Sequence, residues 1–344
     1  MSQPAAPGTR VALLVAGGQV ETLQASPLIR TLHAGIPGAS ITVACSPDAE
    51  SLARALEGAD ATLGLPALDG GRSPLRWLSA WASLRRLRFD IAVICSTAPS
   101  VRLLTYLAGI PRRLGPGGGV TTILLSDRVA ERRHDNRAAN WLRLAHPLGI
   151  ASERHHPRLE PGPEADQRAL VQLHSSGIAD GRLLVALVPG TGHCDVSGVA
   201  PEETAWTPER WAHLANQLAA RHGVGIVFVG TAEDEAAVAA AAVDVEAPHA
   251  DITGQLDLLA LAALLHHCDL LVSGDSPLLH LAAAVGTPTI GLFGPTDGRR
   301  RGPYGEEHRI VQALPGEHRR GDGADGLMEQ IRVEDVLAGI EASL

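Results

Sequence analysis

The chain has 344 residues, of which 45% are hydrophobic and 19% are charged, and this length is enough for two domains of ordinary size. Its formal net charge of −9 argues against a nucleic acid as partner, because there is no basic excess to neutralise phosphates. No apolar run approaches the ~20 residues that span a bilayer, and the first ten residues lack the apolar core of a signal peptide. By elimination we expect a cytoplasmic protein.

The first half of the chain alternates between strand-like and helix-like runs. Short buried strands are predicted at Val11–Ala16, Ile41–Cys45 and Ile91–Cys95. Helical spacing of apolar residues is found at Thr22–Ala34, Ala49–Glu57, Leu75–Leu87, Val101–Ala108 and Asn136–Leu148. We take this half as an N-terminal domain over residues 1–154.

A Pro-rich stretch, HHPRLEPGP, begins at His155, and we predict an interdomain linker over residues 155–165. A second α/β set follows over residues 166–326. Its predicted strands are Leu183–Val188, Gly225–Val229, Leu270–Val272 and Thr289–Phe293, and its predicted helices include Pro208–His222 and Glu233–Ala242. Residues 327–344 form a closing amphipathic helix that could pack back on the first domain. Because open α/β sheets bind ligands at the carboxyl edge of their strands, an active site is expected at those edges.

The most informative stretch is a Gly-Asp-Ser-Pro corner between an apolar strand and an Ala-rich helix. Ser276 suits the N-cap position, and Pro277 suits the first helical position. The amides of the next turn can then stabilise an anion such as a phosphate, with Asp275 beside it. These amides belong to Leu278, Leu279 and His280.

A second candidate anion loop, Gly190-Thr191-Gly192, follows the strand that ends at Val188. Its glycines would let backbone amides approach a phosphate closely. The alternative is that both loops are ordinary βα turns. After the next strand, Glu235 could bind ribose hydroxyls, or it could be a carboxylate favoured by the start of a helix.

The corner and its surroundings resemble the donor-site signature of glycosyltransferase family 9, the ADP-heptose:lipopolysaccharide heptosyltransferases. The segments that carry the resemblance are DSPLLHLAAA, GLFGPT and GPYG. The family signature is Asp-Thr-Gly-x-x-His, so Ser276 matches Thr and Pro277 replaces Gly. Weaker similarity is found in ITGQLDLLALAALLHHCDL, from Ile252, and in ASPLIRTLHAGIPGASITV, from Ala25.

This resemblance implies an α/β protein with parallel sheets, in which two Rossmann-like domains face a central cleft (the GT-B fold). It implies a metal-independent glycosyltransferase that moves a sugar, heptose from ADP-heptose, to a lipopolysaccharide-core or other glycan acceptor. The C-terminal domain would bind the nucleotide sugar and the N-terminal domain the acceptor, and no cofactor is expected. Two alternatives are a nucleotide-sugar epimerase on the same architecture and a non-catalytic nucleotide-sugar-binding relative.

The family also suggests roles for single residues. Asp275 and His280 have the family's spacing, and Glu235 has the register of its ribose-binding Glu. Glu21 stands where the family has an Asp proposed as general base, although it could equally be a first-turn helix residue. The family's diphosphate-neutralising Lys is replaced by Thr204. The compensating cation could then be Arg210, Arg299, Arg300 or Arg301.

The run SDRVAERRHDNRAANWLR, residues 126–143, is the best acceptor-side candidate, because Arg binds phosphate and carboxylate bidentately. Within it we single out Arg132, Arg133 and Arg137. Such a run could also hold the protein peripherally at the inner face of the cytoplasmic membrane. The alternative is a solvated helix with internal Glu–Arg pairs.

Metal and thiol chemistry is not predicted. The four cysteines, Cys45, Cys95, Cys194 and Cys268, lack the paired spacing of metal ligands. Cys45 and Cys95 lie in or at the end of apolar strand-like runs, so we expect them to be buried thiols.

Overall fold

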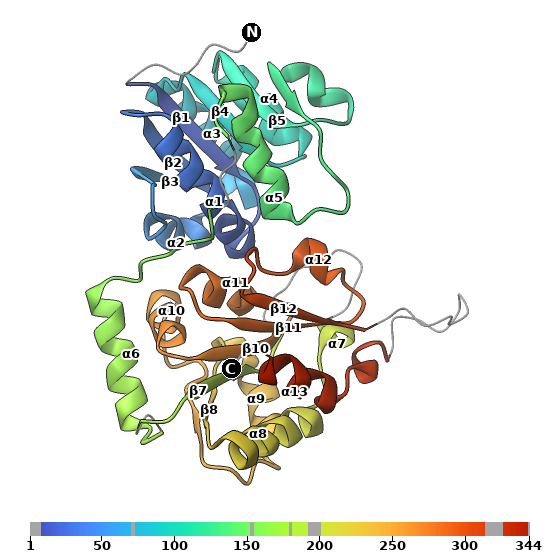
Figure 1. Cartoon of the computed structure of the whole chain (residues 1–344). Helices are drawn as coiled ribbons and strands as arrows, with labels where there is room; N and C mark the ends of the chain where they lie inside the picture. The colour runs from blue at the N-terminus through green and yellow to red at the C-terminus, as the bar shows by residue number, and fades with distance from the viewer. Residues whose placement is uncertain are drawn as a thin grey trace. The chain divides into compact units, whose positions relative to one another are not determined.

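The computed structural model describes residues 8–69, 73–151, 155–178, 181–191, 201–313 and 326–342. The chain divides into two compact units, Met1–Glu160 and Pro161–Leu344 (Figure 1). Their boundary falls inside the segment that the sequence marks as a linker. Each unit is a parallel α/β structure with its own hydrophobic core.

The sheet of the first unit has the order β3-β2-β1-β4-β5-β6, and all its strand pairs are parallel. Its strands are β1 Arg10–Val15, β2 Ser40–Cys45, β3 Ala61–Gly64, β4 Ile91–Cys95, β5 Arg112–Pro116 and β6 Asp127–Val129. The central strands are almost fully buried, as parallel strands covered by helices on both faces must be.

Helices and short 3₁₀ turns connect these strands. They are α1 Gln19–Gly35, η1 Pro47–Ala49, α2 Glu50–Arg54, η2 Pro66–Asp69, α3 Pro74–Leu87, α4 Pro99–Leu107, η3 Val120–Leu124, α5 Arg137–Leu142 and η4 Arg143–Leu148. α1 packs against α5, while α3 and α4 pack together over β1 and β4 through Ala80, Leu84 and Leu104.

The second unit repeats the same strand order. Its sheet runs β12-β11-β10-β7-β8-β9, again with every pair parallel. The strands are β7 Leu184–Val188, β8 Gly225–Phe228, β9 His249–Asp251, β10 Leu270–Gly274, β11 Thr289–Phe293 and β12 His308–Gln312. The prediction of two similar α/β halves is therefore confirmed.

The helices of the second unit are α6 Pro163–Ser175, α7 Pro201–Thr204, α8 Pro208–His222, η5 Ala232–Asp234, α9 Glu235–Ala242, α10 Leu258–His266, α11 Pro277–Ala284, α12 Gly298–Arg301, η6 Met328–Gln330 and α13 Val333–Glu341. The apolar face of the closing helix α13 is used within this unit. It packs on α8, β11 and β12, with Val336, Leu337 and Ile340 in the core.

One expectation about local structure was wrong, and five short strands were not predicted. The predicted helix over 136–148 is α-helical only to Leu142 and continues as the 3₁₀ segment η4, which contains Pro147 and therefore lacks an amide hydrogen there. The short strands β3, β5, β6, β9 and β12 were not predicted. β5 begins with two arginines, and β3, β6, β9 and β12 carry exposed or half-exposed side chains instead of a buried apolar run.

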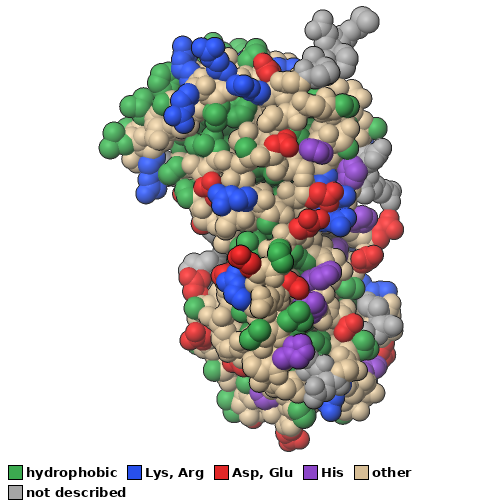
Figure 2. Space-filling model, turned by 90° about the vertical axis from the view of Figure 1, so that its left-hand side faces the viewer, with side chains coloured by type: hydrophobic (Ala, Val, Ile, Leu, Met, Phe, Trp, Pro, Cys, Tyr) green, Lys and Arg blue, Asp and Glu red, His purple; other side chains and the backbone are tan. Residues whose placement is uncertain are grey.

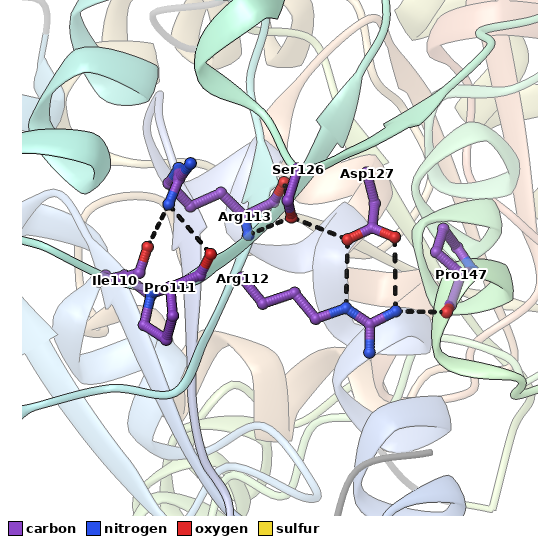
Figure 3. Close-up of polar contacts among 7 residues, drawn as sticks. All are labelled: Ile110, Pro111, Arg112, Arg113, Ser126, Asp127 and Pro147. Carbon is purple, nitrogen blue, oxygen red and sulfur yellow. Dashed lines mark hydrogen bonds and ion pairs between the residues drawn. The ribbon is translucent and has the colours of Figure 1, made fainter. Parts of the chain in front are cut away.

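Arg112 joins three elements of the first unit (Figure 3). Its Nε and Nη2 donate to the two carboxylate oxygens of Asp127 at 3.1 and 3.4 Å, and Nη2 also donates to the Pro147 carbonyl at 2.6 Å. Ser126 Oγ donates to Asp127 at 2.8 Å. Burial by itself raises the pKa of Asp127, but the hydrogen bonds from Arg112 and Ser126, with the Arg112 charge, bring that pKa below its ordinary value.

We predict a pH-dependent stability contribution from this carboxylate. Because the pKa of Asp127 is lower in the folded than in the unfolded protein, its carboxylate stabilises the fold at every pH above the unfolded pKa. This stabilisation is lost as the pH falls through the folded pKa. Asp127→Asn should lower the free energy of unfolding by about 1.5–3 kcal/mol at neutral pH. The difference from the parent should shrink below pH 3.8, the ordinary Asp value.

Urea unfolding followed by circular dichroism at several pH values measures this difference. In an Arg112→Gln background, the same Asp127→Asn substitution should have a smaller effect with less dependence on pH. An effect that is constant down to acid pH would contradict the assignment.

Candidate functional site

The start of α11 lies at the centre of the carboxyl edge of the second sheet, because β10 pairs with β7 on one side and β11 on the other. Ser276 occupies the N-cap position as expected, with extended backbone angles. Its hydroxyl, however, hydrogen-bonds to Ser273 Oγ at 2.7 Å, and no side chain caps the helix. No side chain therefore competes with an anion for the first-turn amides, of which the Leu279 amide donates to the Ser276 carbonyl at 3.3 Å.

Asp275 is held by a cation from the neighbouring strand's loop. Its carboxylate accepts from Arg301 Nε at 2.6 Å and from Arg301 Nη2 at 3.4 Å. Asp275 is only 2% exposed, whereas the Arg301 side chain retains 24% exposure. This bidentate pair fixes the end of β10 to α12 and brings a positive charge close to the start of α11.

His280 is also buried, with 5% of its surface exposed, one turn into the same helix. The side chains of Leu278 and Leu279 lie in the core, so these two residues can offer a ligand only their backbone amides. The structure thus brings Asp275, Ser276 and His280 to one corner, as the sequence predicted.

Gln312, on β12, organises the adjacent loop, and the sequence reasoning missed it. Its Nε2 donates to the carbonyls of Phe293, Gly294 and Thr296 at 3.0–3.1 Å, and its Oε1 accepts from the Gly298 amide at 2.9 Å. A polar residue at the end of the run RIVQ was the available signal.

The loop after β7 has a packing constraint. A Cβ built on Gly190 would overlap the carboxylate of Asp234, which is buried and accepts from the Thr231 amide and hydroxyl at 2.9 Å. Gly190 is therefore required by its neighbour's side chain. Thr191 is half-buried, and Gly192 lies outside the described residues.

Glu235 is the first residue of α9 and is exposed, as is Glu233. The acidic residue between them, Asp234, is the buried one and was not singled out from the sequence. The pattern Thr231-x-x-Asp234 is a capping box and could have identified it.

The candidate counter-charges differ in availability. Thr204 is buried at the end of α7. Arg210 donates to the carbonyls of Met328 and Ile331, so it anchors the segment before α13. Arg301 is paired with Asp275, whereas Arg299 and Arg300 have exposed side chains on α12.

In the first unit, Glu21 lies in the first turn of α1, just beyond the carboxyl end of β1. Its Oε2 accepts from the Gly18 amide at 3.1 Å, and its Oε1 accepts from Arg137 at 2.6 Å. The structure therefore joins the candidate base to one of the three candidate acceptor-binding arginines. It also confirms that Glu21 has a role at the helix start.

Arg132 and Arg133 are exposed in the segment between β6 and α5. The Asn140 side chain holds the backbone of Arg132 at 2.9 and 3.0 Å. The alternative of one solvated helix over 126–143 was wrong, because only residues 137–142 are α-helical. The described ion pairs that involve this run are Arg143–Asp135, Arg112–Asp127 and Arg137–Glu21.

Cys45, Cys95 and Cys268 are buried free thiols, which confirms the expectation for the first two. Burial, with a smaller effect of Glu50, raises the pKa of Cys45 to about 12. Within the described parts of the chain, no group of three or more His, Cys, Asp or Glu residues could hold a metal ion. No helix among those residues is long and apolar enough to cross a membrane.

Comparison with known proteins agrees with this geometry. The family model described as glycosyltransferase family 9 (heptosyltransferase) matches residues 77–322. Lipopolysaccharide heptosyltransferase 2 of Escherichia coli K12 is 28% identical over 326 residues, which cover 90% of each chain. The Salmonella typhimurium protein of the same name is also 28% identical over 90% of each chain.

Solved structures share the fold over nearly the whole chain. A glycosyl transferase family 9 protein from Veillonella parvula has a TM-score of 0.86 at 19% identity, with 99% of this chain and 98% of that chain covered. E. coli ADP-heptose heptosyltransferase II has a TM-score of 0.75 at 22% identity, with coverages of 97% and 98%.

Two units with parallel six-stranded α/β sheets, which match the solved heptosyltransferase structures, define the GT-B fold. The chain belongs to glycosyltransferase family 9, the heptosyltransferase family.

We predict that Gly190→Ala destabilises the protein by about 1–3 kcal/mol, because the added methyl group must displace Asp234 and its capping contacts. Thermal and urea unfolding measure this loss. Gly339→Ala is the matched control. Gly339 lies inside α13, and a Cβ there would contact Ile290 and Val311 at ordinary distances of 3.7 and 3.9 Å. The substitution should therefore be neutral, or stabilise the protein by up to about 1 kcal/mol. Equal effects of the two substitutions would contradict the packing argument.

Proposed function

We propose that this enzyme transfers heptose from ADP-heptose to a lipopolysaccharide-core acceptor. The observation that carries the proposal is the start of α11, where uncapped amides adjoin the buried Asp275 and His280. The names of the relatives support the choice of sugar and acceptor, since E. coli heptosyltransferase 2 is a lipopolysaccharide enzyme and a related E. coli structure was solved with ADP.

On the donor side, the diphosphate would accept hydrogen bonds from the first-turn amides of α11 and from the loop at Gly190 and Thr191. Its charge would be balanced by the helix dipole and by Arg299 and Arg300, which project from the neighbouring α12. Asp275 would face the sugar while Arg301 keeps its carboxylate in one orientation. Glu235 would hold the ribose hydroxyls.

On the acceptor side, Glu21 would take the proton of the attacking hydroxyl. The hydroxyl oxygen forms a bond to the anomeric carbon, the bond from that carbon to the diphosphate oxygen breaks, and ADP leaves with the electron pair. Arg137 and the Gly18 amide each occupy one lone pair of the Glu21 carboxylate, so they orient the base and leave acceptor sites on both oxygens. Arg132 and Arg133 would bind anionic groups of the acceptor.

We further propose that the reaction needs no divalent metal and no cofactor, because the helix start and the α12 arginines supply positive charge to the leaving diphosphate.

The first test is binding and turnover. Calorimetry with ADP, UDP and GDP should show binding by at least one, with affinities between millimolar and micromolar, about −4 to −8 kcal/mol. Asp275→Ala with His280→Ala should weaken it. If that variant unfolds, Arg299→Ala with Arg300→Ala should weaken binding without loss of stability. Val243→Ala, on the exposed end of α9, is the control.

With ADP-heptose and a heptose-deficient lipopolysaccharide core, transfer should proceed equally with and without a chelator. Loss of transfer on chelation, restored by magnesium or manganese, would overturn metal independence. Conversion of the nucleotide sugar without an acceptor would favour an epimerase, and binding without turnover would favour a non-catalytic protein.

The second test concerns Glu21. Glu21→Gln keeps an oxygen that can accept the Gly18 amide but cannot take a proton, so kcat should fall by about 10²-fold or more with donor affinity nearly unchanged. Glu21→Asp should retain measurable activity. The matched control is Glu50→Gln, which removes another ion-paired carboxylate, that of Glu50 with Arg54, from the same unit. Parental turnover in Glu21→Gln would leave Glu21 with its helix-start role alone.

A further inference from the structure

One surface of the first unit is apolar and basic at once. All seven large hydrophobic side chains that are exposed in the described part of this unit belong to α3, α4 and η3. They are Leu75, Leu78, Leu103, Tyr106, Leu107, Val120 and Ile123. Three of them, Leu75, Val120 and Ile123, are more than three-quarters exposed, at 79%, 91% and 77%. In the described part of the second unit, the four exposed residues of this kind are scattered over separate parts of the sequence.

The three elements form one continuous layer, since α3 packs on α4 and α4 on η3. Trp81 Nε1 donates to the Leu107 carbonyl at 3.0 Å and ties α3 to α4. The buried Arg102 of α4 donates to the carbonyls of Pro116 and Gly118 at 2.9 and 2.8 Å, just before η3. The exposed apolar side chains are therefore displayed on a rigid layer, which we call the α3–α4–η3 face.

The charge of this layer is opposite to that of the whole protein. Between Ser73 and Ser126 the sequence contains seven arginines and a single acidic residue, Asp90, in a chain of net charge −9. The Asp90 carboxylate accepts a hydrogen bond from the Arg10 backbone amide at 2.8 Å. The arginines with exposed side chains are Arg76, Arg85, Arg86 and Arg88. Hydrophobic and basic side chains of this kind lie together at the upper left of Figure 2.

The basic residues converge on a groove at the end of α3. Trp81, Arg85, Arg86 and Arg88 line it, together with the acidic Asp90 and the turn from Ala108 to Ile110. The Arg85 guanidinium lies 5.7 Å from the Trp81 ring centroid. Aromatic and arginine side chains placed in this way suit the boundary between lipid headgroups and acyl chains.

We propose that the α3–α4–η3 face docks the enzyme on a bilayer rich in anionic phospholipid, with the aliphatic side chains entering the headgroup region and the arginines on lipid phosphates. Charge selects this occupant. A symmetric dimer through the same face would oppose the arginines of two copies, whereas an anionic membrane neutralises them. Membrane docking goes beyond the proposed heptose transfer, and the experiment below tests docking separately from transfer.

The sequence favoured the arginine run at 126–143 for membrane binding, but this run lacks the exposed apolar side chains that would enter the headgroup region. Its exposed Arg128, Arg132 and Arg133 stand beside Glu131 and Asp135, and none of its described residues is an exposed large hydrophobic. Without inserted apolar groups, electrostatic attraction alone gives weaker and more salt-sensitive binding.

The experiment is co-sedimentation of the full-length protein with vesicles of phosphatidylglycerol and phosphatidylethanolamine, and with vesicles of phosphatidylcholine alone. The parent should bind the anionic vesicles at least about tenfold better, and added salt should weaken the binding. Val120→Asp with Ile123→Asp removes the apolar part, and Arg85→Glu with Arg86→Glu removes the basic part. Each should reduce partitioning by about tenfold or more.

The matched control is Val171→Asp with Val243→Asp, which adds the same charges at exposed valines of the second unit and should leave vesicle binding unchanged. ADP affinity and thermal stability are measured for every variant and should be unchanged, which shows that the fold and the donor site are intact. The proposal is overturned if the parent does not bind anionic vesicles. It is also overturned if Arg132→Glu with Arg133→Glu abolishes vesicle binding while the variants of the α3–α4–η3 face do not. A dimer in light scattering that the variants of this face dissociate would overturn it as well. None of these outcomes bears on heptose transfer, which is assayed with a soluble core fragment.

Discussion

The parallel pairing of β10 with β7 on one side and β11 on the other is the constraint on which the proposed donor site depends. It places the carboxyl ends of three strands in a row, so the loops that follow them must share one edge. The Asp275–Arg301 pair spans two of these loops, and Gln312 fixes the second of them from β12. Gly190 and Asp234 pack together from the loops after β7 and β8, so the edge is a connected set of contacts.

Positive charge at this edge is distributed differently from the family pattern that the sequence suggested. The position of the family's Lys is the buried Thr204, and Arg210 holds backbone carbonyls of the segment before α13. In the proposed function, charge neutralisation of the donor diphosphate would then fall to the α11 helix start and to α12. The ion pair of Arg301 with Asp275 makes that helix part of the site, since it connects the loop after β11 to the end of β10.

Two regions of the first unit have different character, namely the carboxyl end of β1 and the outer layer formed by α3, α4 and η3. At the carboxyl end of β1, Glu21 is held by a backbone amide and by Arg137, an arrangement that restrains a carboxylate without burying it. On the outer layer, α3, α4 and η3 carry exposed apolar side chains, although α3 and α4 also contribute alanine and leucine side chains to the core. Isolated exposed leucines need no explanation, but a concentration in α3, α4 and η3, within a part of the chain that has almost no acidic residues, does.

The sequence alone determined the elements whose signal is local. Buried strands such as β4 and β11 and the helix α8, bounded by Pro208 and Gly223, were predicted to within a residue or two, because apolar periodicity and terminal residues act over short distances. The Asp275-to-His280 corner was predicted for the same reason. Tertiary structure decided what depends on partners far along the chain. Glu21 meets Arg137 across 116 residues and Asp275 meets Arg301 across 26. The strand β5, which begins with two arginines, and the polar edge strand β12 form because neighbouring strands offer them hydrogen bonds. No local pattern of side chains records which groups a fold brings together.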